Sequence, residues 1–140
     1  MNTFYLGIDV AKAKLDCALQ LANGKYKNKV IDNNLPGFKL LSEWLAKQQV
    51  TTLHVCMEAT GVYWEAVAEY LSEQGVLVSV VNPAQIKAFG KSRGVRSKTD
   101  QIDAQLIALF CAEHHPKAWQ APTPGERALR AMVLRLEALQ

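Results

Sequence analysis

The sequence predicts an α/β domain whose mixed sheet has an antiparallel half followed by a parallel half, flanked by helices. Two observations predict this fold class. Three short apolar or alternating segments follow one another across tight turns within residues 4–31, and helical and strand-like segments then alternate. With 140 residues, 49% of them hydrophobic, the chain has the size of one globular domain that buries roughly two-thirds of its unfolded surface.

The antiparallel half is predicted from two turns. Residues 4–10 and 15–21 are compact apolar runs, and the small polar stretch 11–14 joins them, which favours a hairpin. Asn23-Gly24 forms a second turn signal, and residues 26–31 then alternate in polarity. We therefore expect three consecutive strands that form a meander.

The parallel half is predicted from alternating helix and strand patterns. Pro36-Gly37 opens a helix, residues 53–57 return to strand character, and residues 61–74 form a second amphipathic helix that Gly75 caps. Residues 76–81 are nearly unbroken in apolar character, which is typical of a strand buried on both faces. The inner faces of the two helices are expected to carry Phe38, Leu41, Trp44 and Leu45, and Tyr63, Val67, Tyr70 and Leu71.

Beyond Asn82-Pro83 we expect a short helix over residues 84–89, a loop over 90–98 and a helix over 99–114. The last helix is expected to direct Ile102, Leu106, Leu109 and Phe110 toward the core. This order of elements is the one found in ribonuclease H-like folds.

Four acids have contexts that surface carboxylates rarely have. Asp9 and Glu58 each end an apolar run, and Asp100 and Asp103 are three residues apart at the start of a helix, so both can face one site. A buried carboxylate costs several kcal/mol unless it is paired or bound to metal. Magnesium prefers hard oxygen ligands. We therefore predict that these four acids bind Mg2+, with Mn2+ as a substitute, and that they raise one another's pKa values when no metal is bound.

Three of the acids also have ordinary structural explanations. Asp9 can form a turn or cap a helix. Glu58 can pair with Lys12 or Lys14. Asp100 lies in the first turn of a helix, where unpaired N–H groups favour acids.

A local excess of positive charge precedes the last helix, although the net charge of the chain is only +3. No acid lies between Glu73 and Asp100. Such a cluster attracts a phosphate backbone without reading its sequence, whereas its ordinary explanation is a solvated surface. The residues predicted to contact nucleic acid are Lys91, Arg93, Arg96 and Lys98.

The remaining composition favours a cytoplasmic protein. The three cysteines are odd in number and have no CxxC spacing, so we expect reduced thiols in the core. No apolar run approaches the roughly 20 residues needed to cross a bilayer.

The end of the chain predicts a separate segment. Within residues 126–140 four apolar residues alternate at spacings of three and four, which indicates a coiled-coil seam or an amphipathic helix folded onto the domain. No capping residue closes this helix, so we expect it to continue into further sequence. The predicted division is a catalytic domain over residues 1–120 and a helical segment beginning at residue 121. The four apolar residues at alternating spacings of three and four are Leu129, Met132, Leu136 and Leu139.

Three motifs in this order resemble one family. They are GIDVA at residues 7–11, MEATG at 57–61 and KTDQIDA at 98–104. Together they resemble the DEDD transposases of the insertion-sequence one-ten group and the related Piv-type DNA invertases. The resemblance implies a RuvC-like domain in which Asp9, Glu58, Asp100 and Asp103 bind divalent metal for DNA cleavage and strand exchange.

The resemblance also implies properties of the full-length protein. It would have a C-terminal domain bearing a serine nucleophile, which this chain lacks, and it would assemble into dimers or tetramers. It would use a bridge RNA that pairs with DNA, and it would be located at the bacterial nucleoid. The fragment alone is expected to be inactive in recombination.

Other functions stay open at this point. One is a complete nuclease of the Holliday-junction resolvase type, and another is a noncatalytic nucleic-acid-binding assembly module. A third is a nucleotide-binding domain of the sugar-kinase and actin-like type, which begins with a similar Gly7-Ile8-Asp9 strand. The stretch 11–14 offers no glycine-rich phosphate hairpin for that function.

Overall fold

The computed structural model describes residues 3–95, 99–122 and 125. Within these residues the chain forms one five-stranded sheet in the order β3-β2-β1-β4-β5. The first three strands pair antiparallel, and β4 and β5 run parallel to β1. The strands are β1 (Thr3–Val10), β2 (Lys14–Gln20), β3 (Tyr26–Asp32), β4 (Thr52–Glu58) and β5 (Leu77–Val81). The mixed sheet predicted from the sequence is therefore confirmed.

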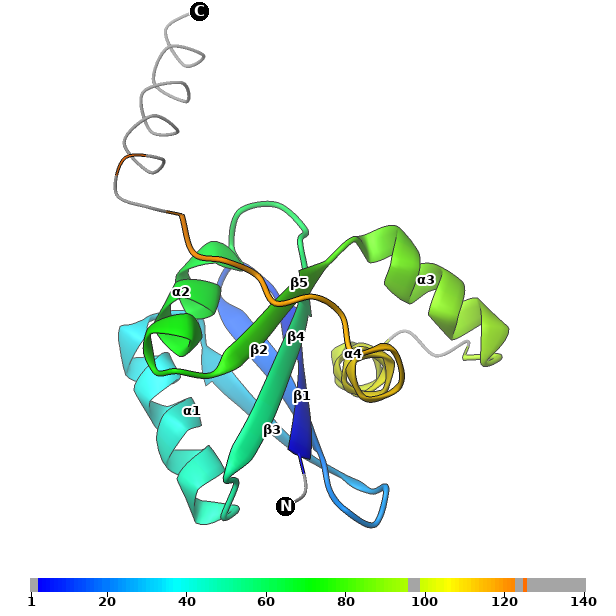
Figure 1. Cartoon of the computed structure of the whole chain (residues 1–140), viewed down its shortest axis with the longest axis horizontal. Coiled ribbons are helices and arrows are strands. Elements are labelled where there is room, and N and C mark those ends of the chain that lie inside the picture. Colours follow the sequence, from blue (N-terminus) through cyan, green and yellow to red (C-terminus); the bar gives the residue numbers. More distant parts are fainter. Residues whose placement is uncertain (1–2, 96–98, 123–124, 126–140) are drawn as a thin grey trace, which may run out of the picture.

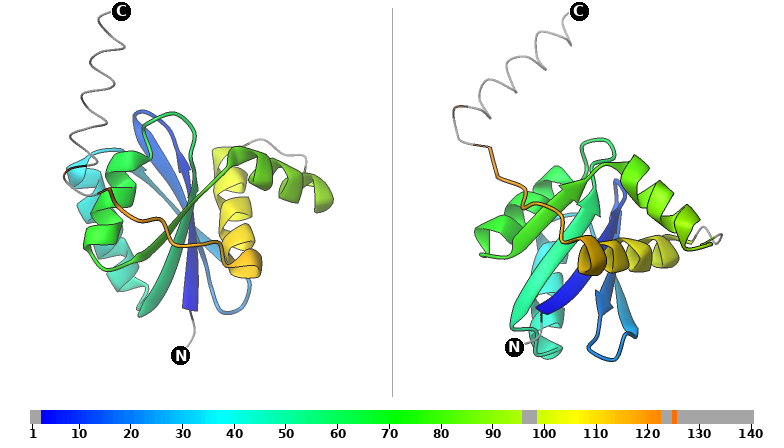
Figure 2. Two further views of the ribbon diagram at one scale, coloured as in Figure 1. Left: turned by 45° about the horizontal axis from the view of Figure 1, so that its top comes forward. Right: turned by 45° about the vertical axis from the view of Figure 1, so that its right-hand side comes forward.

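Helices cover both faces of the sheet. In Figures 1 and 2, α1 and α2 lie on one face, and α4 lies on the other with α3 beside it. The helices are α1 (Leu35–Lys47), α2 (Glu65–Glu73), α3 (Pro83–Ser92) and α4 (Asp100–His114).

The central strand β1 is buried on both faces. Successive side chains of a strand point to opposite faces, so Leu6 and Ile8 enter the core under α1 and α2, while Gly7 and Asp9 face α4. The register pairs Ile8 with Met57 on β4 and Asp9 with Asp16 on β2. This alternation places the carboxylate of Asp9 on the α4 side of the sheet.

The predicted core face of α4 is confirmed for Phe110, which is buried, and in part for Leu106 and Leu109, which pack against the core while staying partly exposed. Ile102, Leu106 and Leu109 are only partly buried. The helix instead rests on its small residues, because it lies so close to β1 that a Cβ on Gly7 would overlap the backbone of α4. Apolar size alone therefore does not identify the residues of α4 that are most fully buried. The buried residues of α4 are Ala104, Ile107, Ala108, Phe110 and Cys111.

The start of the second helix also differs from the prediction. Helix α2 begins at Glu65, four residues later than expected, because Gly61 has a left-handed backbone with φ +64°. Tyr63 is 44% exposed instead of facing the core, and its carbonyl accepts a hydrogen bond from Asn33 Nδ2 at 3.0 Å. Gly75 follows α2 with φ +82°, as a C-terminal glycine should.

Helix α3 is longer than predicted. Residues 90–92 are helical and do not belong to the loop, so Lys91 lies on a helix. The capping box of Asn82 and Gln85 starts the helix, and Gly90 is buried close to Leu106 of α4. The expected loop is correspondingly shorter.

Strand β5 forms an edge of the sheet. Val78 and Ser79 are buried, as predicted, but Leu77 is 46% exposed. The segment after α4 crosses this edge, where the N–H of Trp119 donates to the carbonyl of Val78 at 2.7 Å (Figure 1). The indole of Trp119 then meets Trp64 edge to face, with ring centroids 5.8 Å apart. The edge is thus protected without another strand.

The cysteine prediction is confirmed, since Cys17, Cys56 and Cys111 are buried and free. Among the described residues, no helix is long and apolar enough to span a membrane. Residues 126–140 lie outside the described residues, so the coiled coil and the division at residue 121 stay predictions.

Candidate metal centre

The sheet brings Asp9 and Glu58 together at one edge. Asp9 is the penultimate residue of β1 and Glu58 is the last residue of β4, and these parallel strands end side by side. Both acids lie one position beyond the Ile8–Met57 register pair, so their side chains share the face that α4 covers. The sequence placed both acids at strand ends, and the parallel pairing makes them neighbours.

Helix α4 brings the other two acids to the same place. Thr99 caps the helix, and its Oγ1 accepts a hydrogen bond from the N–H of Ile102 at 3.2 Å. Asp100 and Asp103 therefore lie in the first turn, where the positive end of the helix dipole favours negative charge. One carboxylate oxygen from each of Asp9, Asp100 and Asp103 lies within 4.8 Å of the other two.

Glu58 flanks this triad. Its Oε2 accepts a hydrogen bond from the Thr60 hydroxyl at 3.4 Å. The salt bridge from Lys12 or Lys14 to Glu58, considered from the sequence, is not formed among the described residues, because Lys14 pairs with other acids. Glu58 is therefore half-buried beside three other carboxylates with a hydroxyl as its partner.

Burial and, after it, charge repulsion raise the pKa values of the clustered acids when no metal is bound. Burial, followed by the charges of Asp100, Asp103 and Glu58, raises the pKa of Asp9 from 3.8 to about 7. Burial and the charge of Asp103 raise the pKa of Glu58, although its hydrogen bond from Thr60 opposes the shift. The pKa of Asp103 is raised by burial and then by Asp100. The pKa rise predicted from the sequence is confirmed for these three acids.

Sequence reasoning missed a fifth acid and its partner. Asp16 lies opposite Asp9 in the β1–β2 register and is only 9% exposed. Burial and Asp100 raise its pKa, while Lys14 opposes the rise. The Nζ atom of Lys14 lies 4.0 Å from Asp16 Oδ2 and 3.7 Å from Asp100 Oδ2. The predicted turn at residues 11–14 already implied this register, because residues equidistant from a hairpin turn face each other.

A cleft of about 560 Å³ opens beside the acids. Its lining includes Asp9, Glu58 and Asp103, together with Lys87 and Lys91 of α3. The two lysines are four residues apart, so they share one face of the helix. Lys91 was predicted as a nucleic-acid contact, whereas Lys87 was not. The cleft combines acids that can hold cations with lysines that can hold a phosphate backbone.

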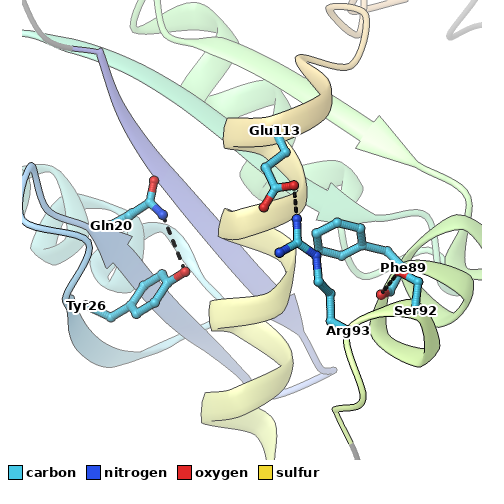
Figure 3. Close-up of polar contacts among 6 residues, drawn as sticks. All are labelled: Gln20, Tyr26, Phe89, Ser92, Arg93 and Glu113. Carbon is cyan, nitrogen blue, oxygen red and sulfur yellow. Dashed lines mark hydrogen bonds and ion pairs between the residues drawn. The ribbon is translucent and has the colours of Figure 1, made fainter.

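Arg93 does not line this cleft. It lies at the C-terminal end of α3, forms an ion pair with Glu113 of α4 and stacks over the Phe89 ring at 5.1 Å (Figure 3). Its role as a phosphate contact stays a prediction. Arg96 and Lys98 lie outside the described residues.

The donor set suits a divalent cation. Every ligand candidate in the cluster is a carboxylate, and Mg2+ and Mn2+ prefer such hard oxygen donors over sulfur or imidazole. Acids that repel one another in the metal-free protein gain most when a cation neutralises them. The arrangement therefore fits the predicted magnesium site.

The comparisons with known proteins agree with this geometry. The model of the insertion-sequence one-ten DEDD family, described as a transposase, matches residues 6–139. The chain belongs to this family. It is 38% identical over 139 residues to the pilin gene-inverting protein of Moraxella bovis, and 37% identical to that of Moraxella lacunata. Each alignment covers 98% of the chain and 43% of the relative, so this DEDD-family chain spans less than half the length of these relatives.

Solved structures identify the fold of the DEDD-family chain. It is similar to Thermus thermophilus RuvC in complex with a Holliday junction substrate, with a TM-score of 0.60, 16% identity, and coverage of 84% of this chain and 100% of RuvC. A second structure of T. thermophilus RuvC gives a TM-score of 0.58 with 18% identity. That alignment covers 83% of this chain and 99% of the RuvC chain. The ribonuclease H-like fold predicted from the order of elements is confirmed, and so is the RuvC-like fold that the resemblance implied.

Proposed function

We propose that this chain is the metal-dependent DNA cleavage and strand-exchange domain of a DEDD transposase or site-specific recombinase. The observation that carries the proposal is the convergence of Asp9, Asp100 and Asp103 oxygens within 4.8 Å, with Glu58 beside them. The acids come from two strands and a helix, so the whole fold is needed to assemble them. The family to which the chain belongs supports a DNA-processing role.

Each group has a distinct part in this proposal. Asp9 lies close enough to the three other acids of the motif to feel their charges, so it would hold the cation together with them. Asp100, Asp103 and Glu58 would complete the ligand set of the cation, and Glu58 and Asp103 also line the cleft that would receive the substrate. When bound, Mg2+ stabilises negative charge on phosphate oxygens and lowers the pKa of a coordinated water.

The lysines of α3 would position the substrate. Lys87 and Lys91 line the same cleft as the acids and would pair with phosphates of a bound substrate. Such contacts are independent of base sequence, so target choice must come from elsewhere. Arg93, Arg96 and Lys98 would extend this basic surface if the sequence prediction holds.

The finer parts of the sequence prediction remain part of the proposal. They are the serine nucleophile in a further domain, a dimer or tetramer, a bridge RNA, and a cytoplasmic location at the nucleoid. Because the chain spans 43% of its relatives, we expect it to bind metal and DNA but not to complete strand exchange alone.

Anomalous diffraction from crystals soaked in manganese tests the metal centre. We expect density between Asp9, Asp100 and Asp103 in the wild type and none in Asp9→Asn. Glu43→Gln, which changes an exposed acid on α1, is the matched control and should keep the density. An empty cluster in the wild type, or equal density in Asp9→Asn, would remove the basis of the proposal.

A complete Holliday-junction resolvase is the second candidate, since RuvC has the same fold. Incubating this chain with a four-way DNA junction and Mg2+ separates the two functions. Symmetrical cleavage by the chain alone would favour the resolvase, whereas binding without cleavage would favour a recombinase domain that needs a further domain.

A further inference from the structure

Lys14 forms ion pairs with two acids at the candidate metal centre. It is the first residue of β2, and its Nζ lies 3.7 Å from Asp100 Oδ2 and 4.0 Å from Asp16 Oδ2. Among the described residues, the ion pairs of the acid cluster all come from this lysine. Asp16 is nearly buried on β2, whereas the side chain of Asp100 is 56% exposed on α4, so the ammonium bridges a strand and a helix.

Both ion pairs are easily exchanged. The side chain of Lys14 is 52% exposed and both distances are near the limit for an ion pair, and such pairs contribute little to stability. A divalent ion carries twice the charge and binds carboxylate oxygens directly. The ion would therefore replace the ammonium at Asp100 and would be repelled by it at short range.

We propose that Lys14 is a resident counter-cation that competes with the divalent metal ion for Asp100. In the metal-free protein it neutralises part of the cluster and holds the start of α4 against β2. Metal binding releases the ammonium from Asp100, while its contact to Asp16 remains. The inference rests on the proposed metal centre and adds to it a residue that lowers metal affinity while it stabilises the metal-free protein.

Calorimetric titration with Mn2+ and thermal unfolding of the same proteins test this role. Lys14→Met removes the charge and keeps much of the length, so we expect about tenfold tighter Mn2+ binding. The metal-free variant should unfold about 2 °C lower, because the acids lose their counter-charge. Lys14→Arg keeps the charge and should behave as the wild type. Lys12→Met alters an exposed lysine of the same turn and is the matched control.

In Lys14→Met, Mn2+ affinity should rise while the unfolding temperature of the metal-free protein falls. A lysine with only a structural role would not produce this combination. Mn2+ binding by Lys14→Met that is unchanged or weaker would overturn the inference, and so would tighter binding that Lys12→Met reproduces. If, in either of these two cases, Asp9→Asn still abolishes Mn2+ binding, the proposal for Lys14 fails but the proposed metal centre stands. Absence of Mn2+ binding in the wild type and all variants would overturn both the metal centre and the role of Lys14.

Discussion

Gly7 of β1 lies directly beneath Ala104 of α4, so close that a Cβ at position 7 would overlap the Ala104 carbonyl oxygen and the Ala108 nitrogen. Asp9 follows Gly7 on the same face of the strand, and Asp103 precedes Ala104 on the helix. The distance between β1 and α4 therefore controls the distance between the acids of the cluster. A glycine in the first motif has a packing role that supports the metal centre.

Gly7→Ala should push α4 away from the sheet. Overpacking against backbone, which cannot move aside as a side chain can, is expected to cost about 3 kcal/mol of unfolding free energy. It should also weaken Mn2+ binding, because Asp100 and Asp103 move away from Asp9. Urea unfolding and calorimetric titration measure the two effects.

Gly24→Ala is the control for this variant. Gly24 has φ +81°, and a Cβ added there would have no neighbouring atom within 4 Å, so alanine costs only about 1 kcal/mol of backbone strain. Its Mn2+ affinity should be unchanged. A Gly7→Ala protein with wild-type stability and metal affinity would contradict the role of this contact.

The stability of the metal-free protein should depend on Asp9 and on pH. The pKa of Asp9 is about 7 in the folded protein and 3.8 without its surroundings, so the folded protein favours the protonated form. The free energy of unfolding therefore falls as the pH rises from about 4 to about 7, and the whole penalty is present above that range. At pH 8, Asp9→Asn should be about 2 kcal/mol more stable than the wild type, an amount reduced for solvent screening.

Unfolding of both proteins in a chelator from pH 4 to pH 8 checks this sign. The difference between them should shrink toward pH 4, and Glu43→Gln should show no such trend. Saturating Mn2+ should reverse the order at pH 8, since it stabilises only the protein that binds it. A variant that is less stable than the wild type at pH 8 in chelator would refute the strain assigned to the cluster.

The lysines of α3 should contribute to DNA affinity without sequence preference. The double variant Lys87→Gln, Lys91→Gln is expected to bind a DNA duplex about tenfold more weakly near 0.1 M salt. The slope of log affinity against log salt should fall by about two. Fluorescence anisotropy over a salt series measures both quantities.

The matched control changes Lys39 and Lys47 to Gln on α1, which lies on the opposite face of the sheet. That protein has the same net charge as the α3 variant and should bind as the wild type. Equal losses in both proteins would mean that DNA responds to overall charge and not to the cleft.

Trp119 should stabilise the domain from outside the sheet. Its N–H pairs with Val78 and its ring contacts Trp64, so the segment holds the open edge of β5. Trp119→Ala should cost about 2 kcal/mol, less than a fully buried tryptophan because the ring is partly exposed. Trp119→Phe should recover much of the lost free energy of unfolding, as measured by urea unfolding. An unchanged urea midpoint in the alanine variant would contradict a stabilising role for this contact.

Local patterns predicted most of the elements. The meander follows from turn residues such as Asn23-Gly24 and from short apolar runs, and both signals act over a few residues. The helix boundaries were less accurate, because Gly61 opens a loop before α2 and a buried Gly90 continues α3. The left-handed backbone of Gly61 delays the start of α2, whereas Gly90 stays helical where it packs against Leu106 of α4.

The sequence by itself determined the order of elements and the position of Asp9, Glu58, Asp100 and Asp103 at strand ends and in a first helical turn. These are consequences of hydrophobic period and capping, which are local. Only the tertiary structure decided that α4 contacts β1 through small residues, that Lys14 reaches Asp100, and that Lys87 lines the same cleft as the acids. These neighbours are distant in sequence, and their contacts depend on strand register and on how closely a helix can approach a sheet.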